Sequence, residues 1–337
     1  MKILVTGGAG YVGTVLIEEL MKKHHVICLD RFFFGIDYLK QKQTGNLELL
    51  QDDIRWFDPK ILDNVDVVLD LASLSNDPSS DLDPKKTFEI NYEGRVRVAK
   101  LSKKHGVKKY VLASSASVYG FQNDLVNEES QVNPLTTYSK AVRLAESEII
   151  PLSDNTFSST VLRFSTLYGI SPRMRFDLAV NIMTYNLYNE GKITINGEGK
   201  QMRPFLHIRD AVRAYQNIIE SPSEKISGQI FNVGSEKQNY QISDLAKEIG
   251  DSIGISYKIE KKGSNDFRSY ALSFNKIRDQ IGFEPKYTVK NAAQEIYKLL
   301  ENGELIFDKK MITLDWYKYL LSNHESLKNL KIKNQIL

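Results

Sequence analysis

The sequence predicts an α/β protein, with a doubly wound parallel β-sheet and a smaller, mixed α/β lobe in the second half of the chain. Three observations predict this fold. Short apolar runs alternate with helical patterns over the first half, a glycine-rich turn follows the first apolar run, and the pattern changes after about residue 166. Alternation of this kind is typical of right-handed βαβ units, which build a parallel sheet.

The first predicted strand, residues 2–6, runs directly into a turn with glycines at 7, 10 and 13. Gly7 permits the tight turn, Gly10 lets backbone N–H groups approach a pyrophosphate, and Gly13 lets the next helix pack close to the strand. The helix expected over 14–23 directs its positive end at the phosphates. The spacing therefore indicates a dinucleotide-binding loop; a glycine loop that merely turns the chain is the alternative.

The second predicted strand, residues 26–30, ends in Asp30. An acidic residue about 20 positions after the glycine loop is placed to bind the adenosine ribose and to repel a 2′-phosphate. The sequence therefore predicts NAD as the cofactor in preference to NADP. The neighbouring Arg31 leaves NADP open, because an arginine beside the ribose can accommodate its phosphate.

Further strands and a long helix continue the alternation. The strands are predicted at 47–51, 66–72, 109–114 and 159–165, and the helix over 84–105. In open parallel sheets, ligands bind beyond the carboxyl ends of the strands. Acids and small polar residues stand at these ends: Asp52, Asp53, Ser73, Ser114, Ser115, Ser165 and Thr166. Taken singly, each serine is more often a cap or turn former, but together these residues predict a site.

The second half of the chain is expected to form a lobe packed on the sheet. Its predicted elements are helices over 175–190, 209–220, 242–250 and 275–281, and a strand over 230–233. We expect an NAD-binding Rossmann domain over residues 1–165, into which 206–233 threads back. Residues 166–337 are expected to form the substrate-binding lobe.

Composition argues against several classes of protein. The 337 residues carry a formal net charge of +3 without a Lys/Arg block, so nucleic acid is not the expected partner. Cys28 is the only cysteine, which excludes disulfides within the chain and fits a reduced cytoplasm. No apolar run approaches the roughly 18 residues of a membrane-spanning helix. The five histidines lack the spacing of metal ligands, so no metal is expected.

Several segments carry a resemblance to a known family. They are the glycine loop, Asp30, Asp53-Ile54, Asn91, Ser114-Ser115-Ala116-Ser117-Val118-Tyr119-Gly120, Tyr138, Glu146, Leu162-Arg163, Tyr168-Gly169, Arg203-Pro204-Phe205-Leu206-His207, Asp210 and Phe231-Asn232-Val233-Gly234. Together they resemble an extended short-chain dehydrogenase/reductase of the NAD-dependent epimerase/dehydratase family, whose members act on nucleotide sugars. The match covers nearly the whole chain.

The resemblance implies a role for individual residues. Tyr138 would be the general base, Ser115 would hydrogen-bond the sugar oxygen, and Asn91 would support the catalytic machinery. The cofactor would be bound by Gly7, Gly10, Tyr11, Val12, Gly13, Asp30, Arg31, Asp53, Ile54, Leu71, Ala72, Ser73, Ser114 and Tyr138. A nucleotide-sugar substrate would be bound by Ser115, Thr166, Arg173, Arg175, Asn181, Arg203 and Arg268. The family also implies a homo-oligomer, a dimer or a tetramer.

The chain departs from the family at the lysine that follows the catalytic tyrosine by four positions. Val142 stands there, and Glu146 stands where the family has its glutamate, so no gap explains the change. Lys140 lies about 200° around the helix from Tyr138 and is expected to point into solvent. A tyrosine titrates near pH 10 and is a poorer base without a nearby cation. NAD binding is still expected, whereas the catalytic rate is in doubt.

A second departure concerns the reaction. Sugar dehydratases of this family carry an Asp-Glu pair where this chain has Ala116 and Ser117, so dehydration is disfavoured. The resemblance therefore implies oxidation at C4 of a nucleotide-activated hexose or heptose, by a 4-dehydrogenase or a 4-epimerase working through a 4-keto sugar. The alternatives are a reductase of nucleotide-linked 4-keto sugars and an NAD-binding protein with impaired catalysis.

Overall fold

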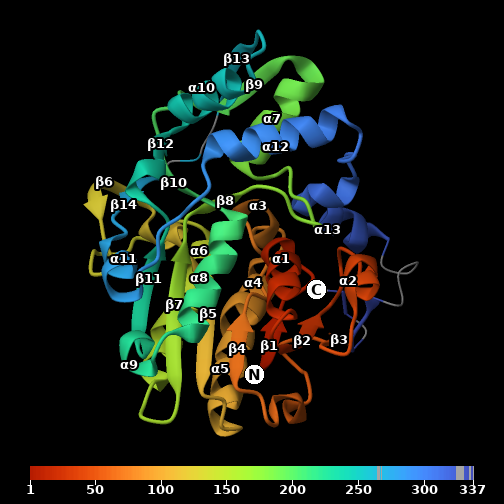
Figure 1. Ribbon diagram of the computed structural model, residues 1–337, viewed down its shortest axis with the longest axis vertical. Helices are drawn as coiled ribbons and strands as arrows, with labels where there is room; N and C mark the ends of the chain where they lie inside the picture. Colours follow the sequence, from red (N-terminus) through yellow and green to blue (C-terminus); the bar gives the residue numbers. More distant parts are fainter. Residues whose placement is uncertain (264–265, 267, 324–329, 334, 337) are drawn as a thin grey trace.

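The chain folds around a seven-stranded sheet in which every pair of neighbouring strands is parallel (Figure 1). The computed structural model describes residues 1–263, 266, 268–323, 330–333 and 335–336. Across the sheet the strands are β11 (Gln229–Val233), β7 (Ser158–Phe164), β5 (Lys109–Ser115), β4 (Val67–Asp70), β1 (Lys2–Thr6), β2 (His25–Asp30) and β3 (Leu47–Gln51). The predicted doubly wound fold is confirmed.

Helices cover both faces of this sheet, so its strands are apolar on both sides. On one face, α1 (Tyr11–Leu20) and α8 (Ile208–Glu220) pack against Ile3 and Val5 of β1. On the other face, α5 (Arg95–Lys104) and α6 (Thr137–Ile149) pack with Leu4. The order of the strands reverses at β1, between β2 and β4. A crevice for ligands is expected at this point, beyond the carboxyl ends of the strands.

The chain leaves the sheet after β7 and returns to it at β11. In between, β10 (Met202–His207) pairs with β8 (Thr166–Tyr168) and β12 (Asn239–Gln241) in a separate three-stranded sheet. Helix α8 then packs on α1, and β11 pairs with β7. Segments from both halves of the sequence therefore meet at the carboxyl edge of the main sheet.

The lobe above the sheet in Figure 1 is built around three packed helices, α7 (Ala179–Glu190), α10 (Ile242–Ile253) and α12 (Val289–Glu301). The pair β9 (Lys192–Asn196) with β13 (Lys258–Lys262) packs on these helices. The pair β6 (Phe121–Val126) with β14 (Ser269–Leu272) and helix α11 (Asn275–Ile281) pack with the core of the main sheet, where α11 contacts β11, and helix α13 (Thr313–Ser322) packs near Leu74. The short helices are α2 (Asp37–Lys42), α3 (Asp77–Ser80) and α9 (Ser223–Ile226). Helices α12 and α13 were not predicted from the sequence.

The single helix predicted over 84–105 is in fact three consecutive helical segments. Helix α4 (Pro84–Phe88) passes into a π-helical turn, Glu89–Gly94, and then into α5. A π-turn adds a residue to the helical repeat and often occurs at functional sites. Asn91 lies inside this turn and Arg95 just after it, and both side chains are buried.

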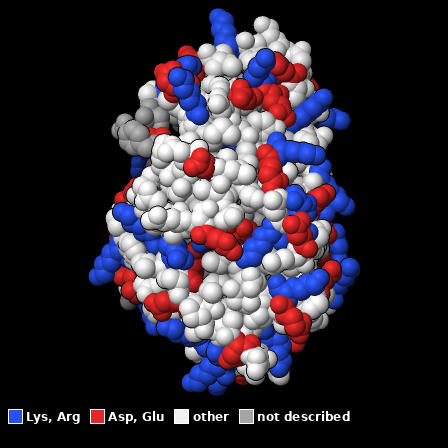
Figure 2. Space-filling view, turned by 90° about the vertical axis from the view of Figure 1, so that its left-hand side faces the viewer, with Lys and Arg blue, Asp and Glu red and all other residues white. Residues whose placement is uncertain are grey.

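Basic and acidic side chains are interspersed over the face seen in Figure 2. Within the described ranges, no helix is long and apolar enough to cross a membrane. The same ranges hold no cluster of three or more His, Cys, Asp or Glu side chains that could bind a metal ion.

A buried ion pair joins helix α6 to strand β7. The Arg163 guanidinium donates to both carboxylate oxygens of Glu146, at 2.9 and 2.7 Å, and the two side chains are 2% and 0% exposed. Arg143 reaches the same carboxylate at 3.2 Å from the surface, where its side chain is 35% exposed. Burial makes the inner pair sensitive to the loss of one partner, since the remaining charge would be left uncompensated.

We expect Arg163→Met to lower the free energy of unfolding by about 3–5 kcal/mol, because it leaves the buried Glu146 carboxylate without its charged partner in the core. Arg143→Met, the matched control on the same carboxylate, should cost less than about 1 kcal/mol because its charge is solvated. Urea denaturation of both variants measures the difference. Equal losses would contradict the importance assigned to the buried pair.

Candidate active site

A cavity of about 730 Å³ opens at the carboxyl edge of the sheet, beneath the lobe. Volumes of this size are typical of small-molecule sites. Nearly all residues predicted for the site line it: Gly7, Gly10, Tyr11, Val12, Gly13, Asp30, Arg31, Asp53, Ile54, Leu71, Ala72, Ser73, Ser114, Ser115, Tyr138, Thr166, Arg173, Arg175, Arg203 and Arg268. The structure therefore brings together residues that are spread over more than 260 positions of the sequence.

The glycine loop closes tightly between β1 and α1. Gly7 has a φ of +66°, and a Cβ there would lie 2.7 Å from the backbone nitrogen of Ala72. A Cβ on Gly13 would lie 2.5 Å from the Gly8 carbonyl oxygen, so helix α1 could not approach the strand as closely. Helix α1 begins right after Gly10 and presents its N-terminus to the cavity. Free backbone N–H groups and the helix dipole make this a place for a diphosphate.

Asp30 is held in one orientation at the end of β2. Its carboxylate accepts hydrogen bonds from the backbone N–H groups of Ala9, at 2.9 Å, and of Phe32, at 2.7 Å. Burial raises the pKa of this carboxyl, while the backbone hydrogen bonds and Arg31 lower it. The orientation fits a carboxylate that receives the hydroxyl groups of a ribose.

Arg31 is occupied by partners within the protein. It forms an ion pair with Asp53 at 2.6 Å and donates to the carbonyl oxygens of Leu330 and Gln335, at 2.9 and 2.8 Å. Its terminal nitrogens thus bind groups of the protein, so Arg31 no longer argues for NADP as the cofactor. The same contacts bring residues near the C-terminus to the cavity, whose wall includes Ile336.

The candidate catalytic pair lies where β5 ends and α6 begins. Ser115 is the last residue of β5, and Tyr138 is the second residue of α6. The hydroxyl of Thr136 caps α6 by accepting from the backbone of Ser139, whose own hydroxyl accepts from the backbone of Thr136. This reciprocal cap fixes where the helix starts. Burial raises the pKa of the Tyr138 phenol, and hydrogen bonding with Ser115 lowers it.

No cationic side chain stands at the lysine position of helix α6. Val142 is 0% exposed and packs in the main apolar core, and Lys140 is exposed. The expectation that Lys140 lies at the surface is confirmed.

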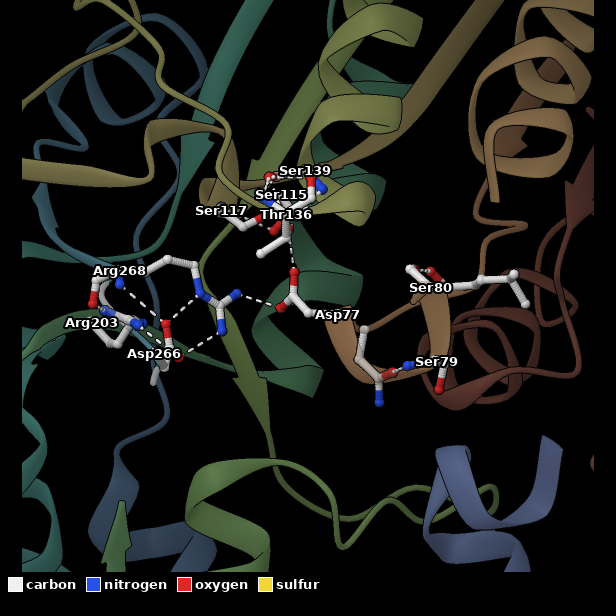
Figure 3. A network of polar contacts seen from close by, with 12 residues as sticks. Asp77, Ser79, Ser80, Ser115, Ser117, Thr136, Ser139, Arg203, Asp266 and Arg268 are labelled. Carbon is white, nitrogen blue, oxygen red and sulfur yellow. Dashed lines mark hydrogen bonds and ion pairs between the residues drawn. The ribbon is translucent and has the colours of Figure 1, made fainter. Parts of the chain in front are cut away.

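The two arginines from the lobe side are linked to each other through Asp266 (Figure 3). Arg268 donates to its two carboxylate oxygens at 2.8 and 2.7 Å, and Arg203 reaches it at 3.1 Å. These charges lower the pKa of Asp266 to about 2. The two guanidinium groups therefore lie together at the cavity, where their nitrogens bind Asp266, Asp77 and backbone carbonyl oxygens, so a phosphate would have to replace or share these partners.

Asp77 is a site residue that sequence reasoning missed. Its carboxylate accepts from Arg268 and from the hydroxyl of Thr136, and Figure 3 shows it between these two groups. It thereby connects the arginine pair to the cap of helix α6. The only signal in the sequence is the Asn76-Asp77-Pro78 turn after β4, which reads equally well as the start of a short helix.

Two other arginines enter the cavity from the segment before α7. Arg175 forms a two-point ion pair with Asp177, at 2.8 and 3.0 Å. The Arg173 guanidinium lies 3.6 Å from the ring centre of Phe34 and donates to Thr313 at 3.0 Å. Burial lowers the pKa of Arg173 to about 9.

Two predicted site residues, Asn91 and Asn181, do not line the cavity and are 0% exposed. Asn91 uses its amide on the backbone N–H and C=O of Leu74, at 2.8 and 3.1 Å. Asn181 accepts from Gly169 at 2.9 Å and donates to the Arg175 carbonyl at 2.8 Å. Both amides therefore bind backbone groups of loops that border the cavity, and Asn181 has no surface on the cavity in this arrangement.

Comparison with known proteins supports the sequence resemblance. The profile of the NAD dependent epimerase/dehydratase family matches residues 3–234. An uncharacterised UDP-glucose epimerase of Bacillus subtilis is 28% identical over 309 residues, which are 86% of this chain and 95% of that protein. A UDP-glucose 4-epimerase of Lactobacillus helveticus is 27% identical, with 85% of this chain and 93% of the relative covered.

A solved structure has the same fold. The UDP-glucuronic acid 4-epimerase of Bacillus cereus, in complex with UDP-glucuronic acid and NAD, superposes with a TM-score of 0.81 at 25% identity. The match covers 90% of this chain and 99% of that one. With its family profile, glycine loop and cavity, this chain belongs to the NAD-dependent epimerase/dehydratase family.

Proposed function

We propose that this protein is an NAD-dependent oxidoreductase acting at C4 of a nucleotide sugar, and specifically a 4-epimerase of a UDP-sugar. The observation that carries the proposal is that one cavity joins the glycine loop, the Ser115–Tyr138 pair and the arginine pair. The UDP-sugar is favoured because the relatives above are UDP-sugar 4-epimerases by name.

We assign the cofactor to the N-terminal side of the cavity. The N-terminus of α1 and the glycine loop would receive the diphosphate of NAD, and Asp30 would receive the adenosine ribose. When bound, NAD supplies the hydride acceptor and donor at C4. The residues fit this cofactor, because the glycine loop, the N-terminus of α1 and Asp30 line the same side of one cavity.

The proton is handled by Tyr138. Its phenol oxygen takes the proton of the C4 hydroxyl as the hydride leaves that carbon, and Ser115 hydrogen-bonds the same sugar oxygen. Tyr138 returns the proton when C4 is reduced again. In an epimerase the second hydride transfer occurs on the other face of C4, so oxidation and reduction cancel and no second substrate is consumed.

The substrate diphosphate is assigned to Arg203 and Arg268. Their side chains come from β10 and from the segment before β14, so the lobe would bind the nucleotide while the sheet edge binds the reacting sugar. Ala116 and Ser117, which follow Ser115, provide neither an acid nor a base for dehydration. These residues argue against dehydration, and among the remaining reactions the names of the relatives favour a 4-epimerase.

Incubation of the purified protein with NAD and UDP-glucose, or with UDP-glucuronic acid, tests the proposal. An equilibrium mixture of the two C4 epimers, without net formation of NADH, is expected. Stoichiometric NADH would instead indicate a dehydrogenase. If neither of these, nor any GDP-, dTDP- or CDP-sugar, gives an epimer or NADH, the proposed activity is wrong.

We expect NAD to bind at least about tenfold more tightly than NADP, or ~1.4 kcal/mol, because Asp30 would repel the 2′-phosphate. Asp30→Asn, which keeps the size of the side chain and removes its charge, should reduce the difference in affinity between NAD and NADP. Calorimetric titration with both cofactors measures it. Equal binding of NADP to the unaltered protein would refute the assignment of Asp30.

Tyr138→Phe should slow hydride transfer by about 10²–10⁴-fold, because it keeps the ring and removes the base. Binding of NAD should remain. Single-turnover absorbance of the reduced nicotinamide, after mixing with UDP-sugar, is the measurement. Full hydride transfer in this variant would mean that another group takes the proton.

Arg268→Ala should weaken UDP-sugar binding by about 1.5–3 kcal/mol, or roughly 10- to 150-fold in Kd, while NAD binding stays unchanged. Arg203→Ala should act in the same direction. Arg278, an exposed arginine of α11 that does not line the cavity, gives the control variant Arg278→Ala. Normal UDP-sugar affinity in both cavity variants would remove these arginines from the site.

A further inference from the structure

We propose that the buried guanidinium of Arg95, which reaches the sheet edge from helix α5, supplies the positive charge that Tyr138 needs and that its own helix lacks. Arg95 would be a positioning residue, acting on the base through the protein rather than touching the substrate. The inference rests on the proposed function, in which Tyr138 is the base.

Helix α6 offers Tyr138 no cation of its own. Val142 is buried in apolar surroundings and Lys140 is exposed. Arg143 turns to Glu146, at 3.2 Å, and is itself neutralised there. A phenol in a dry environment is held neutral by desolvation, so an activating charge must come from another element.

Arg95 is placed behind the wall of the cavity. One terminal nitrogen, Nη2, donates to the carbonyl oxygens of Asp70 and Ala113, each at 2.7 Å. These two residues stand near the carboxyl ends of β4 and β5, and Ala113 lines the cavity. The Arg95 side chain is 1% exposed. The guanidinium thus bridges the two strands next to the candidate catalytic pair, out of contact with solvent.

Arg95 forms a buried ion pair with Asp70 that is longer than the pair of Arg175 with Asp177, at 3.5 Å against 2.8 Å. Its two short hydrogen bonds go to neutral carbonyl groups, and its Nε lies 3.5 Å from the Asp70 carboxylate without forming a hydrogen bond within the described residues. Asp70 also receives the hydroxyl groups of Thr6, at 2.6 Å, and of Tyr110. Arg175, in contrast, is matched by both oxygens of Asp177. Because this pair is longer, the Asp70 carboxylate cancels the field of the Arg95 guanidinium less completely than Asp177 cancels that of Arg175.

Besides desolvation, five side chains of the elements packed around Tyr138 act on its phenol, and they are Arg95, Asp77, Ser115, Arg175 and Tyr215. Desolvation raises its pKa most strongly, and Arg95 on α5 is the largest influence that lowers it. Asp77 on α3 raises it, whereas Ser115 on β5 and Arg175 before α7 lower it by less. Tyr215 on α8 interacts with both Tyr138 and Arg95. In a low-dielectric interior such charges act over longer distances than in water.

The direct test is the titration of Tyr138 in the absence of any sugar. Near-ultraviolet phenolate absorbance is followed against pH for each protein and for its Tyr138→Phe counterpart, and the difference isolates this one tyrosine. Arg95→Met should raise the apparent pKa by about 1 unit or more, since an opposite charge is lost, and Arg95→Lys should leave it near its original value. Arg97→Met is the matched control, because Arg97 also lies on α5 and binds two carbonyl oxygens.

A rescue variant distinguishes charge from structure. Val142→Lys in the Arg95→Met background places an ammonium at the family's position and should lower the apparent pKa again. If Arg95→Met does not fold because the Asp70 carboxylate loses its charged partner, the double variant Arg95→Met/Asp70→Asn removes both charges. This variant should still raise the apparent pKa of Tyr138. An unchanged titration in a folded Arg95→Met or double variant, at reduced thermal stability, would make Arg95 a structural residue only and overturn the inference.

The pH profile of hydride transfer provides the second readout. Activity that depends on a base rises as pH passes the pKa of that base, so Arg95→Met should move the rising limb to higher pH. If the titration shifts but Tyr138→Phe retains hydride transfer, the proposed function fails while the link between Arg95 and Tyr138 stands. If Tyr138→Phe abolishes hydride transfer and the rising limb of Arg95→Met does not move, the link fails and the function stands.

Discussion

Charge buried beneath the carboxyl edge of the sheet must be compensated inside the protein, and the organisation of the site depends on this requirement. Glu146 is paired with Arg163, Arg31 with Asp53, and Arg175 with Asp177. The first two pairs join segments that the cavity wall brings together: helix α6 with strand β7, and the segments that follow β2 and β3. Since breaking such a pair costs far more than losing a surface one, the pairs hold the cavity wall in a single arrangement.

The same constraint explains how the lobe is connected to the sheet. Asp77 accepts from Arg268, which lies 191 residues away, and from Thr136, the cap of the helix that carries Tyr138. The side chains assigned to the substrate diphosphate and the helix assigned to proton transfer therefore share one carboxylate. The two halves of the proposed reaction site are thus joined directly by side chains of the protein.

The sequence predicted the strands of the sheet well because each is a short apolar run between clear turn signals, as at residues 2–6. The glycine loop and Asp30 could be located because their chemistry depends on local spacing. Asp77 and Arg95 could not, since their roles arise from contacts between distant segments that leave no periodic trace. The sequence predicts one continuous helix over 84–105, because a single π-turn shifts the apolar positions around the helix but does not end the helical run. The backbone contacts of Asn181 could not be predicted either, because the sequence does not show whether an amide binds a ligand or the backbone.

The attachment of Arg31 to Leu330 and Gln335 has a consequence for how the protein is made. Leu330 and Gln335 lie 299 and 304 positions after Arg31 in the chain, yet both contact it at the wall of the cavity. Domains generally fold as they emerge from the ribosome, N-terminal part first. The strands around the glycine loop can assemble early, whereas Leu330 and Gln335 are translated only after helix α12 of the lobe. The contacts of Arg31 that complete this part of the cavity wall can therefore form only after the helices that cover the cavity have been translated.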